Sequence, residues 1–554
     1  MKKYLCLLLA AAMLLCVLAA CDTSGLLNSG GLVGDMLGSW SEKEDEALPG
    51  TKDDDIETVY EESVLDVPQT ETDAPVTEEV TWLDTETEGT TAAVTYPETE
   101  SDIPFETELE TEPELDQAAL ALLQLNVDWN GEEFLILGRA DHVPEELESE
   151  SRTDVLQDAV YRRNLTFEQY CNLHLGVIYE DTYSVSARIK SDVYIGAGEI
   201  DLVYHHMAET AKLAFDGLLL SYTKLDGVDL SAPWWDQGTA DLTIADQIYF
   251  MNGALNYSDE ETTYAMLFNK AKVMDEKKID PYAMVNCNEW TLDRFQSVIR
   301  DASSDLNGDD IYSCDDAYGF VANWETGNVL FYGSDLRYVA NKKGEYPTLA
   351  LDDDGQKKAS DLLDQILLLY YDGHDTFVSD PGEESQSLDC FKQDRAMFMA
   401  EIIQYVKPLS AEMQNEFGVL PIPKYNASQE RYLTWTNGVC STVSVTSAVT
   451  EHEKHGKTLE ILAILSHQSI TPVYYEGLLK QNTEHEEAAK GMLDIIFAGR
   501  VYDLSMYFSE FEFDEIYKTM LSLNRNSFAT AYPRKAKIAQ KELKNLIEQL
   551  EKKQ

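Results

Sequence analysis

An acidic stretch between residues 305 and 316 has the oxygen-bearing side chains and the spacing of a calcium-binding loop. Calcium prefers a shell of hard oxygen ligands, and the loop pattern D-x-[DN]-x-[DN]-G-x5-E supplies such a shell. Two residues depart from it: Asp310 stands where the turn favours glycine, and Asp316 replaces the longer glutamate. The alternative is an acidic, solvated turn. The expected calcium ligands are the side chains of Asp305, Asn307, Asp309 and Asp316 and the backbone carbonyl of Ile311.

The rest of the chain carries no recognisable catalytic motif. His452 and His455 lack the H-E-x-x-H pattern of a zinc protease, and neither a G-x-S-x-G elbow nor a P-loop occurs. A glycoside hydrolase needs only two suitably separated carboxylates, and the chain has 101 Asp and Glu residues. The sequence therefore leaves a glycosidase open. The cysteines at 171, 287, 314, 390 and 440 are odd in number and form no C-x-x-C pair, so they indicate neither a zinc site nor a full set of disulfides.

Two short apolar runs predict buried strands. They are Phe134–Leu137 and Ile200–Tyr204, and helical patterns follow both of them. Strands that alternate with helices indicate a parallel sheet in an α/β fold. Ligands of such sheets lie beyond the carboxyl ends of the strands. The expected ligand-binding residues there are Arg139, His205 and His206, and a plain surface loop is the alternative for the histidine pair.

Tryptophan side chains offer apolar, electron-rich faces on which a sugar ring can stack. Trp324 ends the apolar run that begins at Phe320, and Trp435 and Asn437 lead into the β-type run Val439–Ser447. We expect Trp324 and Trp435 to hold a ring between them, with Asn437 as a further ligand-binding residue. The adjacent pair Trp234 and Trp235 is interpreted as packing at a junction of two lobes.

Helical spacing of apolar residues predicts further helices. The segments are Asp361–Tyr371, Arg395–Tyr405, Lys457–His467 and Lys535–Lys552. Arg395–Tyr405 is expected to be a short helix, and Lys535–Lys552 a docked amphipathic helix at the C-terminus.

The N-terminus has the features of an export signal. Lys2 and Lys3 precede an uncharged Leu- and Ala-rich run that extends to Ala20; a membrane-spanning helix is the competing interpretation. The residues Leu18-Ala-Ala-Cys21 resemble a bacterial lipoprotein lipobox. This resemblance implies cleavage before Cys21 and lipidation of its thiol, which would anchor the chain to a membrane.

The following segment is strongly acidic. Residues 22–116 contain 29 Asp and Glu residues and two lysines, Lys43 and Lys52, with few apolar residues. Such a segment cannot bury enough apolar surface to offset its loss of entropy on ordering. We expect a disordered tether; a segment that captures cations or a partner protein is the alternative. The whole chain, with a net charge of −59, is expected to repel nucleic acid.

Several fragments of the second half of the chain occur in a characteristic order: Met266–Lys270, Asp280–Tyr282, Asn288–Phe295, Phe391 with Asp394–Phe398, and Phe417–Lys424. Taken in this order, they resemble the extracellular solute-binding proteins (family 1, maltose-binding type) of ABC importers. The resemblance covers roughly residues 126–554. It implies two lobes of a type II periplasmic-binding-protein-like fold, joined by hinge crossings, with a carbohydrate bound in the cleft and an ABC permease as partner.

The sequence therefore predicts a lipid-anchored solute-binding protein, a monomer without enzymatic activity, on the extracellular face of the membrane. A surface glycoside hydrolase, or a sugar sensor or adhesin without transport, are the alternatives. No cofactor other than calcium is expected. The expected boundaries are 1–20 for the signal peptide, 21–118 for the lipidated cysteine and linker, 119–250 with 437–495 for lobe 1, and 251–436 with 496–554 for lobe 2.

Overall fold

The computed structural model describes residues 117–141, 146–149, 154–341, 344–379, 383, 385–479 and 486–553. All of them belong to the second of the chain's two units, Thr107–Gln554. The predicted signal peptide, the lipidated Cys21 and the acidic linker up to residue 116 lie outside the described residues. Among the described helices, none is both long enough and apolar enough to cross a bilayer.

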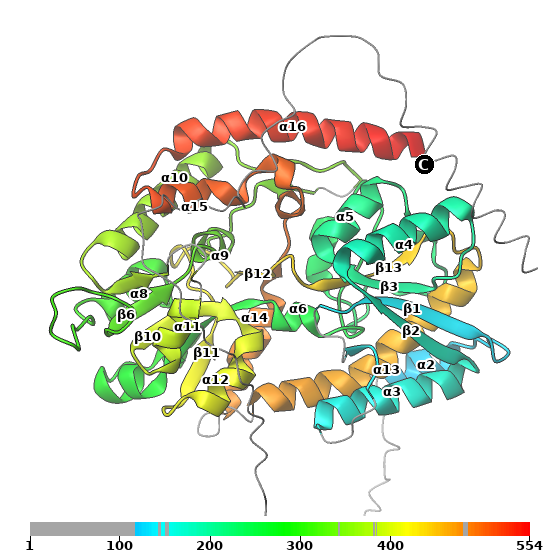
Figure 1. Cartoon of the computed structure of the whole chain (residues 1–554), viewed down its shortest axis with the longest axis horizontal. Coiled ribbons are helices and arrows are strands. Elements are labelled where there is room, and N and C mark those ends of the chain that lie inside the picture. Colours follow the sequence, from blue (N-terminus) through cyan, green and yellow to red (C-terminus); the bar gives the residue numbers. More distant parts are fainter. Residues whose placement is uncertain are drawn as a thin grey trace, which may run out of the picture. The chain divides into compact units, whose positions relative to one another are not determined.

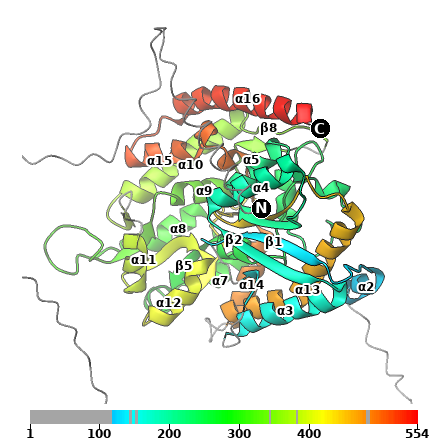
Figure 2. The same ribbon diagram turned by 45° about the vertical axis from the view of Figure 1, so that its right-hand side comes forward.

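Lobe 1 is built on a five-stranded sheet of order β2-β1-β3-β13-β4. The first three of these strands are parallel, and β13 runs antiparallel to both of its neighbours. Figures 1 and 2 show α3 and α13 on one side of this sheet and α4 and α5 on the other. The strands are β1 (Glu133–Arg139), β2 (His174–Glu180), β3 (Leu202–His206), β4 (Leu219–Leu220) and β13 (Ser441–Thr446). The helices are α2 (Gln117–Gln124), α3 (Val155–Cys171), α4 (Thr182–Ile195), α5 (Met207–Phe215) and α13 (His452–Leu479).

Lobe 2 has a second five-stranded sheet, of order β11-β5-β10-β6-β9. Here β10, β6 and β9 are parallel, and β5 runs antiparallel to β10 and β11. The strands are β5 (Tyr264–Asn269), β6 (Tyr318–Ala322), β9 (Thr376–Val378), β10 (Ala396–Ile402) and β11 (Phe417–Leu420). The helices are α7 (Pro281–Asn286), α8 (Leu292–Ile299), α9 (Thr326–Gly333), α10 (Asp353–Tyr371), α11 (Ser385–Lys392), α12 (Val406–Glu412), α14 (Glu486–Ala498) and α15 (Asp514–Ser522).

The two sheets share one topology. In each sheet one strand runs antiparallel to its neighbours, and it lies second from one edge: β5 in lobe 2 and β13 in lobe 1. Each of these strands is the first that the chain forms after it arrives from the other lobe. The carboxyl ends of the parallel strands in both sheets therefore lie near the crossings. This arrangement confirms the predicted two-lobed, periplasmic-binding-protein-like α/β fold.

Three segments connect the lobes. The first crossing includes α6 (Ser258–Glu261), and the second includes β12 (Thr434–Trp435), which pairs in parallel with β14 (Arg500–Val501) of the third. Short elements beside them are η3 (Gln237–Leu242) and η6 (Leu504–Tyr507). The remaining short elements are β7 (Val339–Ala340), β8 (Thr348–Leu349), η2 (Tyr222–Lys224), η4 (Ala271–Glu276), η5 (Ile403–Tyr405) and η7 (Ser509–Phe511).

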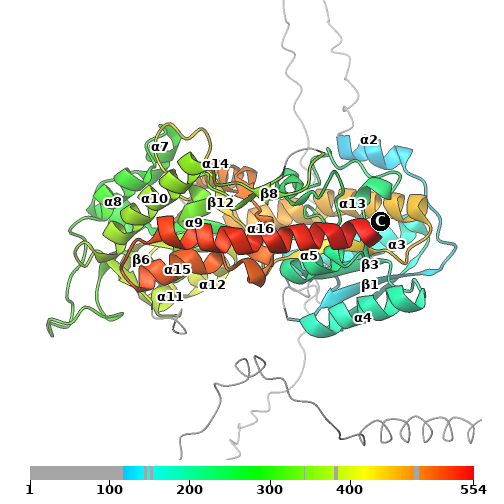
Figure 3. The ribbon, with the colours of Figure 1, turned by 90° about the horizontal axis from the view of Figure 1, so that it is seen from above.

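Two expected boundaries differ in the structure. Helix α14 packs on β11 of lobe 2 although it precedes β14 of the third crossing, so the expected boundary at residue 495 does not separate the lobes. The C-terminal helix α16 (Phe528–Lys553) is not confined to lobe 2, because it contacts α10 and α15 there and also α5 of lobe 1. Figure 3 shows it lying across both lobes.

The segment predicted as a short helix at Arg395–Tyr405 is instead mostly the strand β10. Its residues Ala396–Ala400 are all buried, because β10 is a central strand between β5 and β6. A strand buried on both faces is apolar throughout, and its sequence cannot be told from a buried helical segment by periodicity alone. The prediction of a helix is therefore wrong.

The predicted packing role of the adjacent tryptophans is confirmed. Trp234 and Trp235 are each 2% exposed in the core of lobe 1. Both indole N–H groups donate to one carboxylate of α13, that of Glu460, at 2.9 and 3.1 Å. Burial raises the pKa of Glu460 to about 7.

Candidate functional site

The carboxyl edges of the two sheets meet at a turn of the second crossing, Asn437–Cys440, here called the crossing turn. The Asn437 carboxamide holds the turn, accepting the backbone N–H of Val439 at 3.1 Å and donating to the Tyr264 hydroxyl at 3.2 Å. The backbone N–H of Asn437 also donates to the Thr262 carbonyl at 3.0 Å. The turn is thus fixed to the start of the lobe 2 sheet. Ligand binding by Asn437 stays a prediction.

Arg139 joins the same turn from lobe 1. It is the last residue of β1 and is only 5% exposed, and its Nη1 donates to the Val439 carbonyl at 2.5 Å. Its Nε and Nη2 donate to the two oxygens of Asp141 at 2.8 and 3.0 Å. These bonds hold the pKa of Asp141 well below its usual range. Arg139 therefore positions Asp141, and the half-exposed Asp141 carboxylate is the group that can accept hydrogen bonds from a ligand.

The two predicted histidines have different positions. His205 is completely buried, its Nε2 lies 2.8 Å from the Ser186 hydroxyl, and burial lowers its pKa to about 3. His206 ends β3, and its Nδ1 accepts the backbone N–H of Ala208 at 3.2 Å, which caps α5. Burial lowers its pKa to about 4, so its ring is neutral at neutral pH. The structure places only His206 at the sheet edge; the prediction for His205 is wrong, because successive strand residues point to opposite faces.

At the edge of lobe 2, Asn323 connects two strands. It follows β6, and its Nδ2 donates to Oε2 of Glu401 on β10 at 3.1 Å. Its Oδ1 accepts the backbone N–H groups of Glu325 and Thr326 at 2.9 and 3.1 Å, which fixes the amide orientation. Burial raises the pKa of Glu401 to about 7. Asn323 and Glu401 are polar groups near the carboxyl edge that the sequence did not single out.

Trp324 lies next to Asn323 and is half-buried. The Lys518 ammonium of α15 lies 3.4 Å from the centroid of the indole, an arrangement typical of a cation–π contact. The same ammonium lies 3.3 Å from a carboxylate oxygen of Glu325. Lys518 therefore holds the indole in place beside the polar groups of the edge.

From Trp324 a groove of about 940 Å³ extends along lobe 2. Its walls are rich in aromatic side chains, and two of them, Tyr312 and His374, stack with their centroids 4.2 Å apart. Tyr371 is 43% exposed in the groove. A groove of this size, with aromatic walls and a few polar groups, is typical of a small-molecule site. Its other aromatic residues are Tyr318, Tyr370 and Phe377, and its polar residues include Ser379, Glu515 and Lys518.

Trp435 does not face this groove. It is 3% exposed, stacks on Tyr264 with centroids 5.5 Å apart, and packs against Tyr332 at 5.6 Å. Its ring therefore packs the crossing, next to Asn437. The predicted sandwich of a ligand between Trp324 and Trp435 is wrong for this reason.

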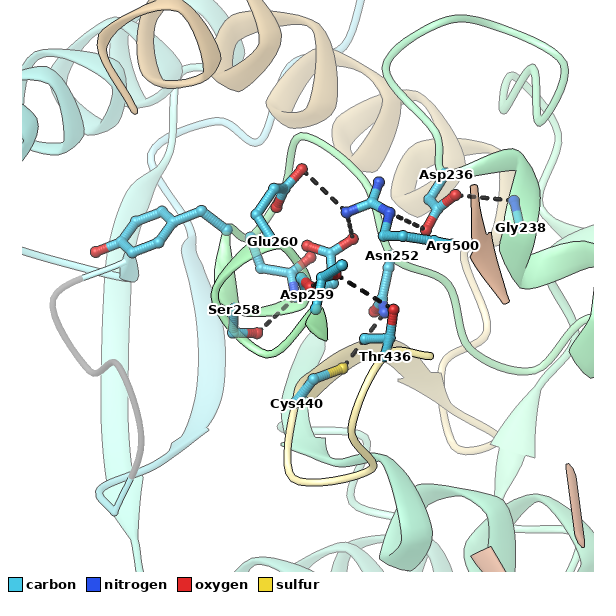
Figure 4. Close-up of polar contacts among 12 residues, drawn as sticks. Asp236, Gly238, Asn252, Ser258, Asp259, Glu260, Thr436, Cys440 and Arg500 are labelled. Atoms are coloured by element: carbon cyan, nitrogen blue, oxygen red, sulfur yellow. Dashed lines mark hydrogen bonds and ion pairs between the residues drawn. The ribbon is translucent and has the colours of Figure 1, made fainter. Parts of the chain in front are cut away.

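The first and third crossings are tied together by a buried ion network centred on Arg500 of β14 (Figure 4). Its guanidinium lies 3.0 Å from Asp259, 3.2 Å from Glu260 and 3.3 Å from Asp236. The Tyr502 hydroxyl donates to Asp236 at 2.6 Å. Burial raises the pKa of Asp259 well above its usual range. Because these residues are far apart in sequence, no local pattern indicated the network.

The predicted calcium loop is ordered by its own backbone. Asp305 accepts the N–H groups of Gly308 and Asp310 at 2.6 and 2.9 Å, and Asp310 takes the left-handed conformation (φ 61°) that the pattern reserves for glycine. Asp316, completely buried, accepts two further backbone N–H groups, which lower its pKa. Among the residues that the structure describes, no three His, Cys, Asp or Glu side chains come together to hold a metal. Calcium binding here stays a prediction.

No protein-family model and no curated protein matches the sequence. Among solved structures, a cyclo/maltodextrin-binding protein complexed with maltotetraose is similar, with 13% identity over 76% of this chain and 97% of that chain, at a TM-score of 0.49. The GacH receptor of Streptomyces glaucescens, solved unliganded and with acarbose, shows 12% identity over 76% and 99% of the chains and a TM-score of 0.47.

A third similar structure is the maltose/maltodextrin-binding domain MalE of Bdellovibrio bacteriovorus bound to maltotriose. It shows 14% identity over 75% of this chain and all of that chain, with a TM-score of 0.46. The resemblance to sugar-binding proteins of the maltose type, noted in the sequence, recurs in these structures. At such identities the likeness concerns the fold and says nothing of the ligand of this chain.

Proposed function

We propose that this chain is the solute-binding receptor of an ABC importer and that it captures a carbohydrate between its lobes. The observation that carries this proposal is the crossing turn. Groups from the carboxyl edge of each sheet, Asp141 of lobe 1 and Tyr264 of lobe 2, are linked through it by hydrogen bonds. A ligand that bonds to both edges favours closure of the lobes about the three crossings.

The chemistry of the site favours a carbohydrate. Trp324 offers an aromatic surface beside the amide of Asn323 and the carboxylate of Glu401, and sugars need both an apolar face and hydrogen-bond partners for their hydroxyl groups. The groove of about 940 Å³ that begins at Trp324 is lined by lobe 2 alone, so it offers room for further sugar units beside the interlobe site. Three structures of similar fold hold maltotetraose, acarbose and maltotriose. We infer an oligosaccharide as the solute of this chain.

The proposal includes membership of the maltose-type family of solute-binding proteins, delivery to a permease, and anchoring. Lipidated Cys21 would hold the protein on the extracellular face of the membrane, and the acidic linker of residues 22–116 would act as a tether. The protein would act as a monomer, without catalysis. A sensor or adhesin of the same fold would bind sugar equally well, so loss of uptake on deletion of the gene separates transport from these alternatives.

A thermal-shift screen of the full chain against mono- and oligosaccharides tests the proposal. A sugar at about 100 times its Kd should stabilise the fold by about 2.7 kcal/mol. We expect a shift with one class of oligosaccharide and no sugar consumed in a long incubation. No shift with any sugar would contradict the carbohydrate proposal, and cleaved products would indicate a glycosidase.

A further inference from the structure

A second cavity, separate from the aromatic groove, lies beside the crossings and is here called the hinge cavity. Its volume is about 690 Å³. Its walls come from η3, from Leu433 next to β12, and from Arg500 and Val501 of β14, so it borders the second and third connections. The remaining walls belong to lobe 2, from the turn after α9, from α10 and from the loop between β11 and β12.

Three cationic side chains in this cavity form no ion pair with any carboxylate of the described residues: Arg337, Lys358 and Arg431. Nη1 of Arg337 donates to the Leu336 carbonyl at 2.6 Å. Nη2 of Arg431 donates to the Ala498 carbonyl. Carbonyl partners fix the two guanidinium groups without neutralising their charge. Nη1 of Arg337 also lies 3.4 Å from the Tyr332 carbonyl. Among the described residues, the Nε and Nη2 groups of Arg337 and the Nε and Nη1 groups of Arg431 have no acceptor. Lys358 lies 5.2 Å from the centre of the Tyr425 ring.

The carboxylates of the cavity lie further out than two of its cations. Asp241, Asp335 and Glu430 are exposed, whereas Arg337 and Lys358 are half-buried. Water and salt screen exposed charges more strongly than buried ones. Burial lowers the pKa of Lys358, and the positive charge of Arg337 acts in the same direction, whereas the carboxylate of Asp335 opposes the shift. Arg337 also acts electrostatically on Asp241 and on the buried Asp503, but neither carboxylate forms an ion pair with it. In a chain with a net charge of −59, three cations that line one cavity without a close ion pair among the described residues are an unusual feature.

The loop that carries Arg431 is already ordered. The side-chain amide of Gln429 donates to the carbonyls of Gly333 and Arg431, both at 2.8 Å, and accepts the backbone N–H of Tyr425 at 3.0 Å. Ser428 and Asn426 form a further hydrogen bond at its tip, 2.6 Å long. A ligand would therefore meet a preformed wall, which lowers the entropic cost of binding.

We propose that the hinge cavity binds a small anion that carries phosphate or carboxylate groups, with Arg337, Lys358 and Arg431 as its cationic ligands. Guanidinium groups suit such anions because their N–H groups match the spacing of the oxygens. This site is distinct from the sugar site of the proposed function, and it does not depend on that function. Because the cavity borders the second and third crossings, an anion bound there would lie beside segments about which the lobes would move.

Isothermal titration of the full chain with inorganic phosphate and with citrate, in chloride buffer of constant ionic strength, tests the proposal. We expect saturable binding of one anion per chain. Lys358→Gln and Arg337→Gln should each weaken that binding roughly ten-fold or more, since each removes a charge-assisted hydrogen bond. Lys544→Gln, with a side chain 75% exposed on α16, is the matched control and should bind like the wild type.

Circular dichroism of each variant without anion checks that the fold is retained. The exposed Arg431→Gln provides a third variant that perturbs the interior least. Absence of saturable binding by both anions would overturn the proposal. Binding that all three substitutions leave unchanged would overturn it as well, because the anion would then lie elsewhere. A sugar that still binds in either case would leave the proposed function intact.

Discussion

Glu460 is a buried acid whose ionisation should make lobe 1 sensitive to pH. It is 3% exposed, and its two oxygens accept the indole N–H groups of Trp234 and Trp235. Burial raises its pKa from 4.5 to about 7, although the two hydrogen bonds from the indoles act in the opposite direction. The folded protein therefore retains a proton that the unfolded chain has already lost between about pH 4.5 and pH 7.

The sign and size of the effect follow from this shift. Because the folded state binds more protons in that window, the free energy of unfolding falls as the pH rises through it and levels off above pH 7. A pKa that rises from 4.5 to about 7 on folding corresponds to roughly 3 kcal/mol of stability lost once the acid ionises. The protonated acid is stable in its site at pH 5, and the ionised acid costs most of this free energy at pH 8.

Glu460→Gln tests the reasoning because glutamine does not titrate. Its NH2 group cannot accept one of the two indole N–H groups, and this cost is the same at every pH. In urea unfolding, the stability of the variant relative to the wild type should therefore rise by about 2–3 kcal/mol between pH 5 and pH 8. Glu548→Gln on α16, whose side chain is 49% exposed, should show no such divergence. A difference between wild type and Glu460→Gln that is the same at both pH values would refute the account.

Three further predictions concern the groove, the ion network and the acidic loop. Trp324→Ala should weaken sugar binding, measured by titration, roughly 10- to 100-fold, whereas Tyr194→Ala, at a position 74% exposed on lobe 1, should leave it unchanged. An equal loss of affinity in both variants would argue against the groove as the sugar site. Arg500→Met leaves buried carboxylates without their counter-ion, so urea unfolding should show a free energy of unfolding lower by about 3–5 kcal/mol. A change under about 0.5 kcal/mol would contradict the stabilising role of the ion network. Calcium should raise the Tm of the full chain but not that of Asp305→Ala, and an equal rise would exclude the loop as the calcium site.

Local sequence patterns predicted much of the fold because parallel strands are short apolar runs. The run Phe134–Leu137 indicated β1, and the rule that ligands lie beyond carboxyl ends then led to Arg139, which contacts the crossing turn. The same reasoning led to Trp324 after β6. It failed for His205, because β3 continues to His206 and the side chain of His205 turns into the lobe.

Other features depend on contacts between distant residues and left no local signal. Glu401 meets Asn323 across two strands, and Lys518 reaches Trp324 from a helix near the end of the chain. Strand β10 was mistaken for a helix because only its central place in the sheet explains its apolar residues. Trp435 was correctly placed next to the crossing, but whether its ring faced a ligand or the core depended on Tyr264 and Tyr332.

The central claim is that a sugar closes the two lobes about the crossings. It is tested most directly by the distance between probes on Tyr194→Cys of lobe 1 and on Cys287 of lobe 2, measured by pulsed electron spin resonance. Both positions are exposed, and Cys314 would be replaced by serine. At saturating oligosaccharide the account predicts a shorter distance than in the free protein, and Trp324→Ala should need more sugar to reach it. An interlobe distance that is the same with and without bound sugar would contradict the account.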